Sequence, residues 1–156
     1  MRLLVLIAFC VSAAVPASAQ QTTHALFGEV LGSGGAISAN YEFAPGRLAL
    51  RAGVGWMPFA EATLPITAAY RLGRRGRMMV GGGVLVAPRV PTSPFSYKPS
   101  ESAVLLSGLL AYRWDVPRGS PKPRRFAQVA FTPLLNVEEG VFVPWIGVAA
   151  GIRLGR

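Results

Sequence analysis

Six charged side chains interrupt otherwise apolar segments of this chain, and their types and spacing could serve two kinds of chemistry. A pair of carboxylates could act as the acid and base of a hydrolytic reaction. The arginines could instead hold the carboxylates in a buried network of ion pairs, because charges removed from water need partners. Structural ion pairs shift the pKa of a carboxylate just as catalytic sites do, so charged residues in an apolar setting are no evidence of catalysis by themselves. We therefore predict the ion-pair network. The six residues are Glu29, Glu42, Arg51, Arg71, Arg113 and Arg153.

Other groups that could support catalysis are few. His24 is the one histidine of the sequence, and nothing near it resembles the nucleophile and acid of a catalytic triad. The glycine-rich stretches 32–35 and 81–83 lack the Gly-Lys-Ser/Thr sequence of a phosphate-binding loop. Cys10 is the one cysteine, which leaves no thiolate metal site. We therefore predict a protein that is not an enzyme, with no catalytic residue, metal ion or cofactor.

The segments that must position the charged residues alternate apolar residues with polar or small ones. A period of two predicts β-strands, whereas helical periodicity is weak and proline and glycine are scattered against it. Each segment has about 8–11 residues, close to what a tilted strand needs to cross a bilayer. The segments are 24–32, 36–43, 47–56, 63–72, 77–87, 103–114, 125–135 and 145–154. The prediction is an all-β protein, an eight-stranded antiparallel up-and-down transmembrane β-barrel.

The last segment illustrates how the two faces differ. Its even positions are apolar, among them Ile146, Val148 and Ile152, and Arg153 lies on the opposite face. We expect the apolar face to meet lipid and Arg153 to point inward with the other five charged residues. Phe126 breaks the alternation of the seventh segment. Side chains fill the interior of an eight-stranded barrel, so a pore is not expected.

Aromatic residues are concentrated near the ends of the apolar faces, where the interfacial girdles of membrane barrels lie. The predicted interface aromatics are Tyr41, Phe43, Trp56, Tyr70 and Tyr112.

The connections between segments differ in charge and length. With the first strand running outward, the outer loops are 32–35, 58–62, 88–102 and 136–144, and four glutamates fall in them. The inner turns are 44–46, 73–76 and 115–125, which collect basic residues suited to anionic headgroups. The loop 88–102 contains Phe95 and Tyr97 between prolines, and we predict these two aromatics as candidate contacts for an extracellular partner.

The start of the chain has the order of a secretory signal peptide. Arg2 precedes an apolar run, and Ala17-Ser18-Ala19 forms a small-residue cleavage site. We predict a signal peptide over 1–19 and one domain, the outer-membrane β-barrel, over 20–156. The chain is 51% hydrophobic and 15% charged, well below the charged fraction of about 25% in soluble domains. Its net charge of +9 is spread over turns and single positions, which argues against nucleic-acid binding.

By these patterns the chain resembles the small eight-stranded outer-membrane β-barrel proteins of Gram-negative bacteria. The resemblance rests on the export signal, the alternation, the stretch 27–43 and the ending 145–156. It implies an outer-membrane location, a porin-like fold, contact with outer-membrane lipids and insertion by the barrel assembly machinery. Many such barrels end on an aromatic residue that this machinery reads, whereas this chain ends Leu154-Gly155-Arg156. Members of this family are adhesins, structural proteins or lipid A enzymes, so the fold alone does not give the function.

Three functions remain open from the sequence. The first is a non-enzymatic integral outer-membrane protein with a structural role or a surface interaction through its loops. The alternative is a soluble periplasmic or secreted barrel of the lipocalin kind, in which Ile146, Val148 and Ile152 would line an apolar ligand cavity. The third is a barrel enzyme that modifies lipid A, which would need a histidine and serine pair.

Overall fold

The structure is a computed structural model that describes residues 22–57, 60–73, 77–87, 91–93, 96–99, 103–116, 125–137 and 140–154. The predicted signal peptide, residues 1–19, lies outside these ranges. Regular structure in the described ranges consists of strands. They are β1 (Thr22–Gly32), β2 (Gly35–Pro45), β3 (Leu48–Met57), β4 (Ala60–Leu72), β5 (Met78–Ala87), β6 (Pro91–Ser93), β7 (Ser96–Pro99), β8 (Ala103–Val116), β9 (Arg125–Phe131), β10 (Leu134–Asn136), β11 (Val141–Val143) and β12 (Ile146–Leu154).

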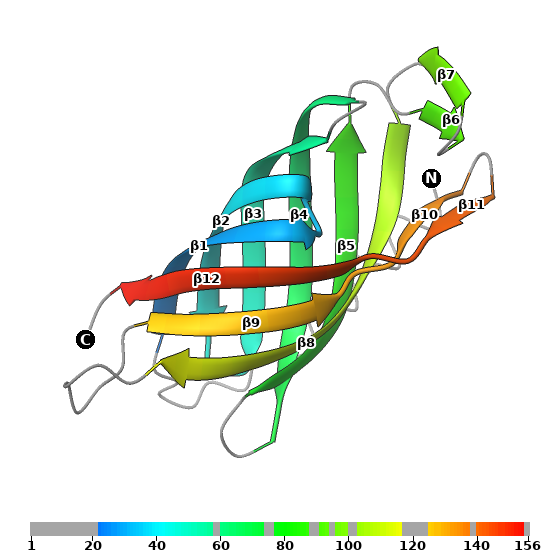
Figure 1. Ribbon diagram of the computed structural model, residues 1–156. Helices are drawn as coiled ribbons and strands as arrows, with labels where there is room; N and C mark the ends of the chain where they lie inside the picture. Colours follow the sequence, from blue (N-terminus) through cyan, green and yellow to red (C-terminus); the bar gives the residue numbers. More distant parts are fainter. Residues whose placement is uncertain are drawn as a thin grey trace.

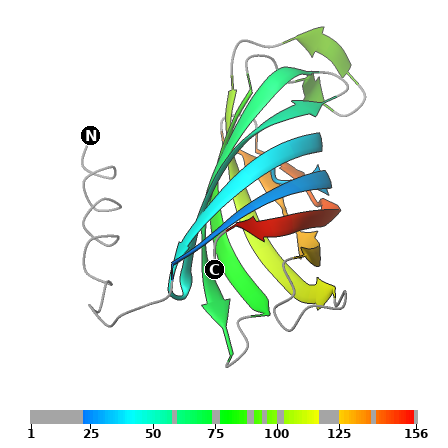
Figure 2. The same ribbon diagram turned by 90° about the vertical axis from the view of Figure 1, so that its left-hand side faces the viewer.

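The strands close into a barrel. Neighbours in the sheet follow the order β11-β10-β8-β5-β4-β3-β2-β1-β12-β9, and a further pairing of β8 with β9 closes the ring (Figures 1 and 2). The first strand pairs with the last, from His24 opposite Leu154 to Val30 opposite Val148. The predicted closed eight-stranded antiparallel up-and-down β-barrel is therefore confirmed. Closure pairs each of the eight barrel strands on both sides along most of its length, and the extension β11 pairs on one side, with β10.

Two of the eight barrel strands are interrupted by proline. β9 continues into β10 after Thr132 and Pro133, and β11 continues into β12 after Pro144 and Trp145. Proline has no N–H to donate to the ladder, so pairing lapses at these points. Single backbone bonds bridge the breaks, from Gly108 N to the Pro133 carbonyl and from Thr132 N to the Trp145 carbonyl. Figure 1 shows the β10–β11 hairpin near one end of the barrel, where β10 is paired with β8.

The two ends of the barrel are distinguished by their connections. At the turn end, β1 begins, β12 ends, and residues 46–47, 73–77 and 117–124 join neighbouring strands. Gly46 there has φ +66°, a left-handed conformation that glycine adopts without steric cost. At the loop end the connections are 33–34, 58–59, 137–140 and the segment 88–102, which contains the small β6–β7 hairpin.

Several predicted connections are shorter than expected. Residues 60–62 belong to β4 and 141–143 to β11, although both fell in predicted loops. Asp115 and Val116, placed in an inner turn from the sequence, lie in β8. Proline and charge marked these stretches as loops, but strands in a closed barrel extend as far as a neighbour offers backbone partners.

The alternating pattern places two different sets of side chains on the two faces of the wall. Ile146, Val148 and Ile152 point outward, with 67%, 59% and 44% of their surface exposed. The buried positions between them are Gly147 and Ala149. The described part of the barrel interior contains three buried apolar clusters and a set of buried polar residues. No helix of the described residues is long and apolar enough to cross a membrane.

Candidate functional site

The centre of the barrel interior is organised around the carboxylate of Glu42. This side chain on β2 is 1% exposed. Arg51, directly opposite on β3, donates from Nε to Glu42 Oε2 at 2.9 Å. Arg71 on β4 donates to Oε1 at 2.6 Å. The interior thus gathers guanidinium groups from strands on different sides of the barrel onto one acid.

Arg113 on β8 completes the group across the barrel. Its two terminal nitrogens donate to both oxygens of Glu42, each at 2.8 Å. This two-point geometry is the strongest form of arginine–carboxylate pairing. Three arginines therefore share one carboxylate, and their charge exceeds what that carboxylate neutralises.

Gln128 on β9 supplies a second acceptor for the crowded arginines. Its Oε1 accepts from Arg113 Nε at 3.1 Å, from Arg113 Nη2 at 2.9 Å and from Arg51 Nη2 at 3.3 Å. It lies opposite Arg113 in the β8–β9 register and is almost completely buried. The alternation of the seventh segment sets Gln128 opposite Ala127 and Val129. A neutral amide gives no signal that it would join a charge network.

Two phenylalanines extend the network through their ring faces. The Arg113 guanidinium lies 3.9 Å from the centre of the Phe126 ring, and Arg51 lies 5.3 Å from that of Phe27. The two rings meet edge to face with centres 6.0 Å apart. Such contacts favour a cation when water is excluded. Phe126, which broke the predicted alternation, is an interior residue, and its neighbour Arg125 takes the outward position.

The remaining two predicted network residues lie apart from Glu42. Arg153 is nearer the turn end, where its Nη1 lies 2.6 Å from Asp115 Oδ1 in a partly exposed ion pair. Glu29 points toward the loop end, where its Oε2 accepts from the backbone N–H and the hydroxyl of Ser33, both at 3.1 Å. No arginine of the described residues forms an ion pair with Glu29. Four of the six predicted residues are thus brought together.

Apolar side chains close the interior toward the loop end. Met57, Leu85, Leu105 and Leu134 form a buried cluster, against which Val143 and Trp145 pack. A polar layer separates this cluster from the arginines and includes Ser38, Asn40, Thr67 and Ser107. These layers place buried side chains along the interior between the arginines and the loop end, the arrangement expected for eight strands.

The predicted interface aromatics lie on the outer face. Tyr41, Trp56, Tyr70 and Tyr112 are all exposed, and Phe43 is half-buried. Trp56 is near the loop end, whereas the other four are nearer the turn end. Trp114, which the sequence analysis did not single out, stacks on Tyr112 with ring centres 6.2 Å apart. The aromatic band is therefore denser toward the turn end.

The structure surrounds His24 with aromatic side chains. Its Nδ1 lies 2.5 Å from the hydroxyl of Tyr41, and its ring contacts that of Phe43. Neither a serine nor a carboxylate is among these contacts, so the described surroundings do not assemble a serine–histidine pair. The described residues also contain no group of three histidine, cysteine or acidic side chains able to hold a metal ion.

The placement of Ile146, Val148 and Ile152 bears on the lipocalin-like alternative. That alternative needs these side chains to line the interior, and the structure places all three outside. The interior positions are instead taken by the arginine network and the polar layer.

The two aromatic residues predicted as loop contacts cannot be placed among these side chains. Phe95 lies outside the described residues. Tyr97 belongs to β7, and its side chain lies outside the described part of the structure.

No known family model, curated protein or solved structure matches this chain.

Proposed function

We propose that this protein is an integral outer-membrane β-barrel with no enzymatic activity. The observation that carries the proposal is the outward-facing apolar belt. Each barrel strand contributes exposed aliphatic side chains, while charged groups pair inside. In water this arrangement would expose a large continuous apolar surface, whereas in a bilayer the same surface is solvated by acyl chains. One such residue from each barrel strand is Leu26, Ile37, Val54, Ile66, Val80, Leu106, Val129 and Val148.

The charge distribution supports an orientation with the turn end in the periplasm. Arg47, Arg77 and Arg125 lie at the turn end, and the predicted inner turns add further basic residues. Anionic phospholipid headgroups attract such residues. The loop end carries four glutamates in its predicted loops, namely Glu61, Glu101, Glu138 and Glu139. With an export signal over 1–19, this orientation places the loop end on the cell surface.

The proposed role is structural or a surface interaction made by the connections at the loop end. The packed interior supports a wall element rather than a channel. Loops carried on a rigid scaffold are the usual place for binding residues. The membrane partners are outer-membrane lipids and, during insertion, the barrel assembly machinery; an extracellular partner would contact the segment 88–102.

Fractionation and gel mobility test this proposal together. The full chain, expressed with its own leader in a Gram-negative host, should be recovered in the outer-membrane fraction. It should also migrate differently in SDS before and after boiling, because a closed barrel in lipid resists the detergent at low temperature. Recovery as a soluble periplasmic protein with no change in mobility would rule the proposal out.

A further inference from the structure

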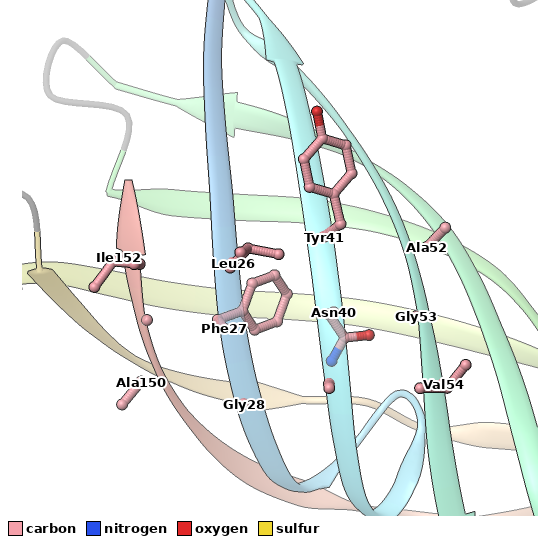
Figure 3. A pocket seen from close by; sticks show the side chains of 12 residues that line it. Leu26, Phe27, Gly28, Asn40, Tyr41, Ala52, Gly53, Val54, Ala150 and Ile152 are labelled. Atoms are coloured by element: carbon pink, nitrogen blue, oxygen red, sulfur yellow. The ribbon is translucent and has the colours of Figure 1, made fainter. Parts of the chain in front are cut away.

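A hollow in the outer wall lies among the described residues of the barrel. The hollow has a volume of about 550 Å³ and opens to the outside between β12, β1, β2 and β3. Figure 3 shows the side chains that line it, including Leu26, Tyr41, Val54 and Ile152. The surface that it offers is almost wholly apolar, and it lies within the belt that we propose faces lipid.

The shape of the hollow follows from a step in side-chain size between two neighbouring rows of the sheet. In one row, Ala150, Gly28 and Ala39 are paired across β12, β1 and β2 and form a low floor. In the next row toward the turn end, Ile152, Leu26 and Tyr41 are paired across the same strands and stand higher. The row toward the loop end is also large, because Val148, Val30 and Ile37 are paired across the same strands. The floor is thus a depression one row wide, bounded by large side chains on both sides.

A single cation stands beside the higher row. Arg125 on β9 pairs directly with Ile152, so it continues that row by one strand. Among the described side chains of the eight barrel strands, it is the one charged group on the outer face. No described residue forms an ion pair with Arg125. An exposed arginine at the edge of an apolar belt places its stem along the wall and its guanidinium at headgroup level.

Polar groups also mark the rim above Tyr41. The Tyr41 hydroxyl and His24 Nδ1 are joined by a contact of 2.5 Å on the outer surface, toward the turn end from the floor. Moving from the floor toward the turn end, the wall therefore changes from small apolar residues to large apolar residues, and then to hydroxyl, imidazole and guanidinium groups. This is the order of chemistry along one phospholipid, from acyl chain to headgroup.

We propose that the hollow holds one acyl chain of an anionic phospholipid of the inner leaflet, with its phosphodiester group beside Arg125. The inference rests on the proposed membrane location and names a specific lipid contact within it. Charge complementarity selects this occupant: Arg125 forms no ion pair with a described residue and lies at the basic turn end. A second copy of the chain is the competing occupant, and the test below distinguishes it from a lipid.

The test starts from the full chain refolded into neutral phosphatidylcholine vesicles, with flotation and gel mobility to check insertion. The inserted protein is then transferred to micelles with equal amounts of phosphatidylglycerol and phosphatidylcholine, and native mass spectrometry counts the lipids it retains. The wild type should retain phosphatidylglycerol in preference. Arg125→Gln should lower that preference about fivefold, the contribution expected of one basic residue near a membrane surface. Arg47→Gln, which changes an exposed arginine in the β2–β3 turn, is the matched charge control; it measures the general attraction of the basic turn end, and the effect of Arg125→Gln should exceed it.

A second pair of variants tests the hollow itself. Ala39→Leu raises the floor and should abolish retention of the preferred lipid. Ala68→Leu makes the same change on the outer face of β4, outside the hollow, and should behave as the wild type. Insertion with equal retention of both lipids by the wild type, or with no effect of Ala39→Leu and Arg125→Gln, overturns the lipid proposal alone. A dimer abolished by Ala39→Leu assigns the hollow to a second copy and also overturns it. Failure to insert into neutral vesicles would instead contradict the proposed membrane location.

Discussion

The inner and outer faces of the same strands contrast sharply in this barrel. On β2, Glu42 points inward to three arginines while its neighbour Tyr41 points outward from an apolar surface. A soluble domain would place these chemistries the other way round. The contrast shows that inward side chains are stabilised by specific partner residues, whereas outward side chains are stabilised by the medium that surrounds the barrel. Substitutions on the two faces should therefore fail for different reasons.

The largest effect is expected from Glu42→Gln. The substitution keeps the shape but leaves Arg51, Arg71 and Arg113 around a neutral amide in a buried site. Removal of one partner from a buried ion pair costs about 3–5 kcal/mol. Urea unfolding in phosphatidylcholine vesicles should show this loss. Glu29→Gln is the control, because Glu29 bonds to Ser33 rather than to an arginine. Equal effects of the two substitutions would contradict a centre built on Glu42.

The next largest effect is expected from Ile66→Arg on the outer face of β4. Ile66 is exposed in the middle of the apolar belt. An arginine near the bilayer midplane costs about 2–4 kcal/mol, falling to about 0–1 near the interfaces. Leu72→Arg, at the end of the same strand, should therefore be nearly neutral under the same urea titration. If Ile66→Arg proved harmless in vesicles, the belt would face water and not lipid.

A smaller effect is expected from Phe126→Leu. Leucine keeps an apolar side chain in the interior but removes the ring face under the Arg113 guanidinium. We expect a loss of about 1–2 kcal/mol, from the lost cation–π contact and some lost packing. Phe131→Leu, on the outer face of the same strand, is the matched control. A larger loss for Phe131→Leu would show that the inward ring carries no special contact.

The smallest effect is expected from Asp115→Asn. Its ion pair with Arg153 is partly exposed, at 38% and 29% of the two side chains. Pairs open to solvent contribute about 0–1 kcal/mol and weaken with salt. Unfolding at low and high ionic strength should show a loss that shrinks as salt is added. A loss as large as that of Glu42→Gln would place this pair within the central network.

The fold was predictable because the two faces of each strand meet different surroundings. Apolar residues must therefore alternate along the strand with polar or small ones. Positions such as Ile146, Val148 and Arg153 are assigned by this alternation alone. The pairing of Glu42 with Arg113, 71 residues away, could not be assigned, because it depends on closure and on the register of the sheet. Phe126 was misread because an aromatic residue is apolar on either face, and only the arginines beside it explain its inward position.

The limits of the strands were harder to predict. Proline and charged residues near positions 60–62 and 115–116 indicated loops, yet backbone partners on the neighbouring strands continue the ladder there. Gln128 had no distinguishing signal, because an inward amide is common in polar barrel interiors. The face on which a side chain lies can be read from its neighbours in the sequence. The residues that it contacts depend on how the barrel closes.

The span of the Glu42 network along the chain has a consequence for how the barrel forms. Its members lie on β2, β3, β4, β8 and β9, and the closing pair of strands joins His24 to Leu154. An open sheet of β1 to β5 alone carries Arg51 without its acceptor Gln128. Such nonlocal contacts make folding slow and strongly cooperative. We therefore expect the network to favour the closed barrel, because Arg51 and Arg113 reach the acceptor Gln128 only when β9 is in place.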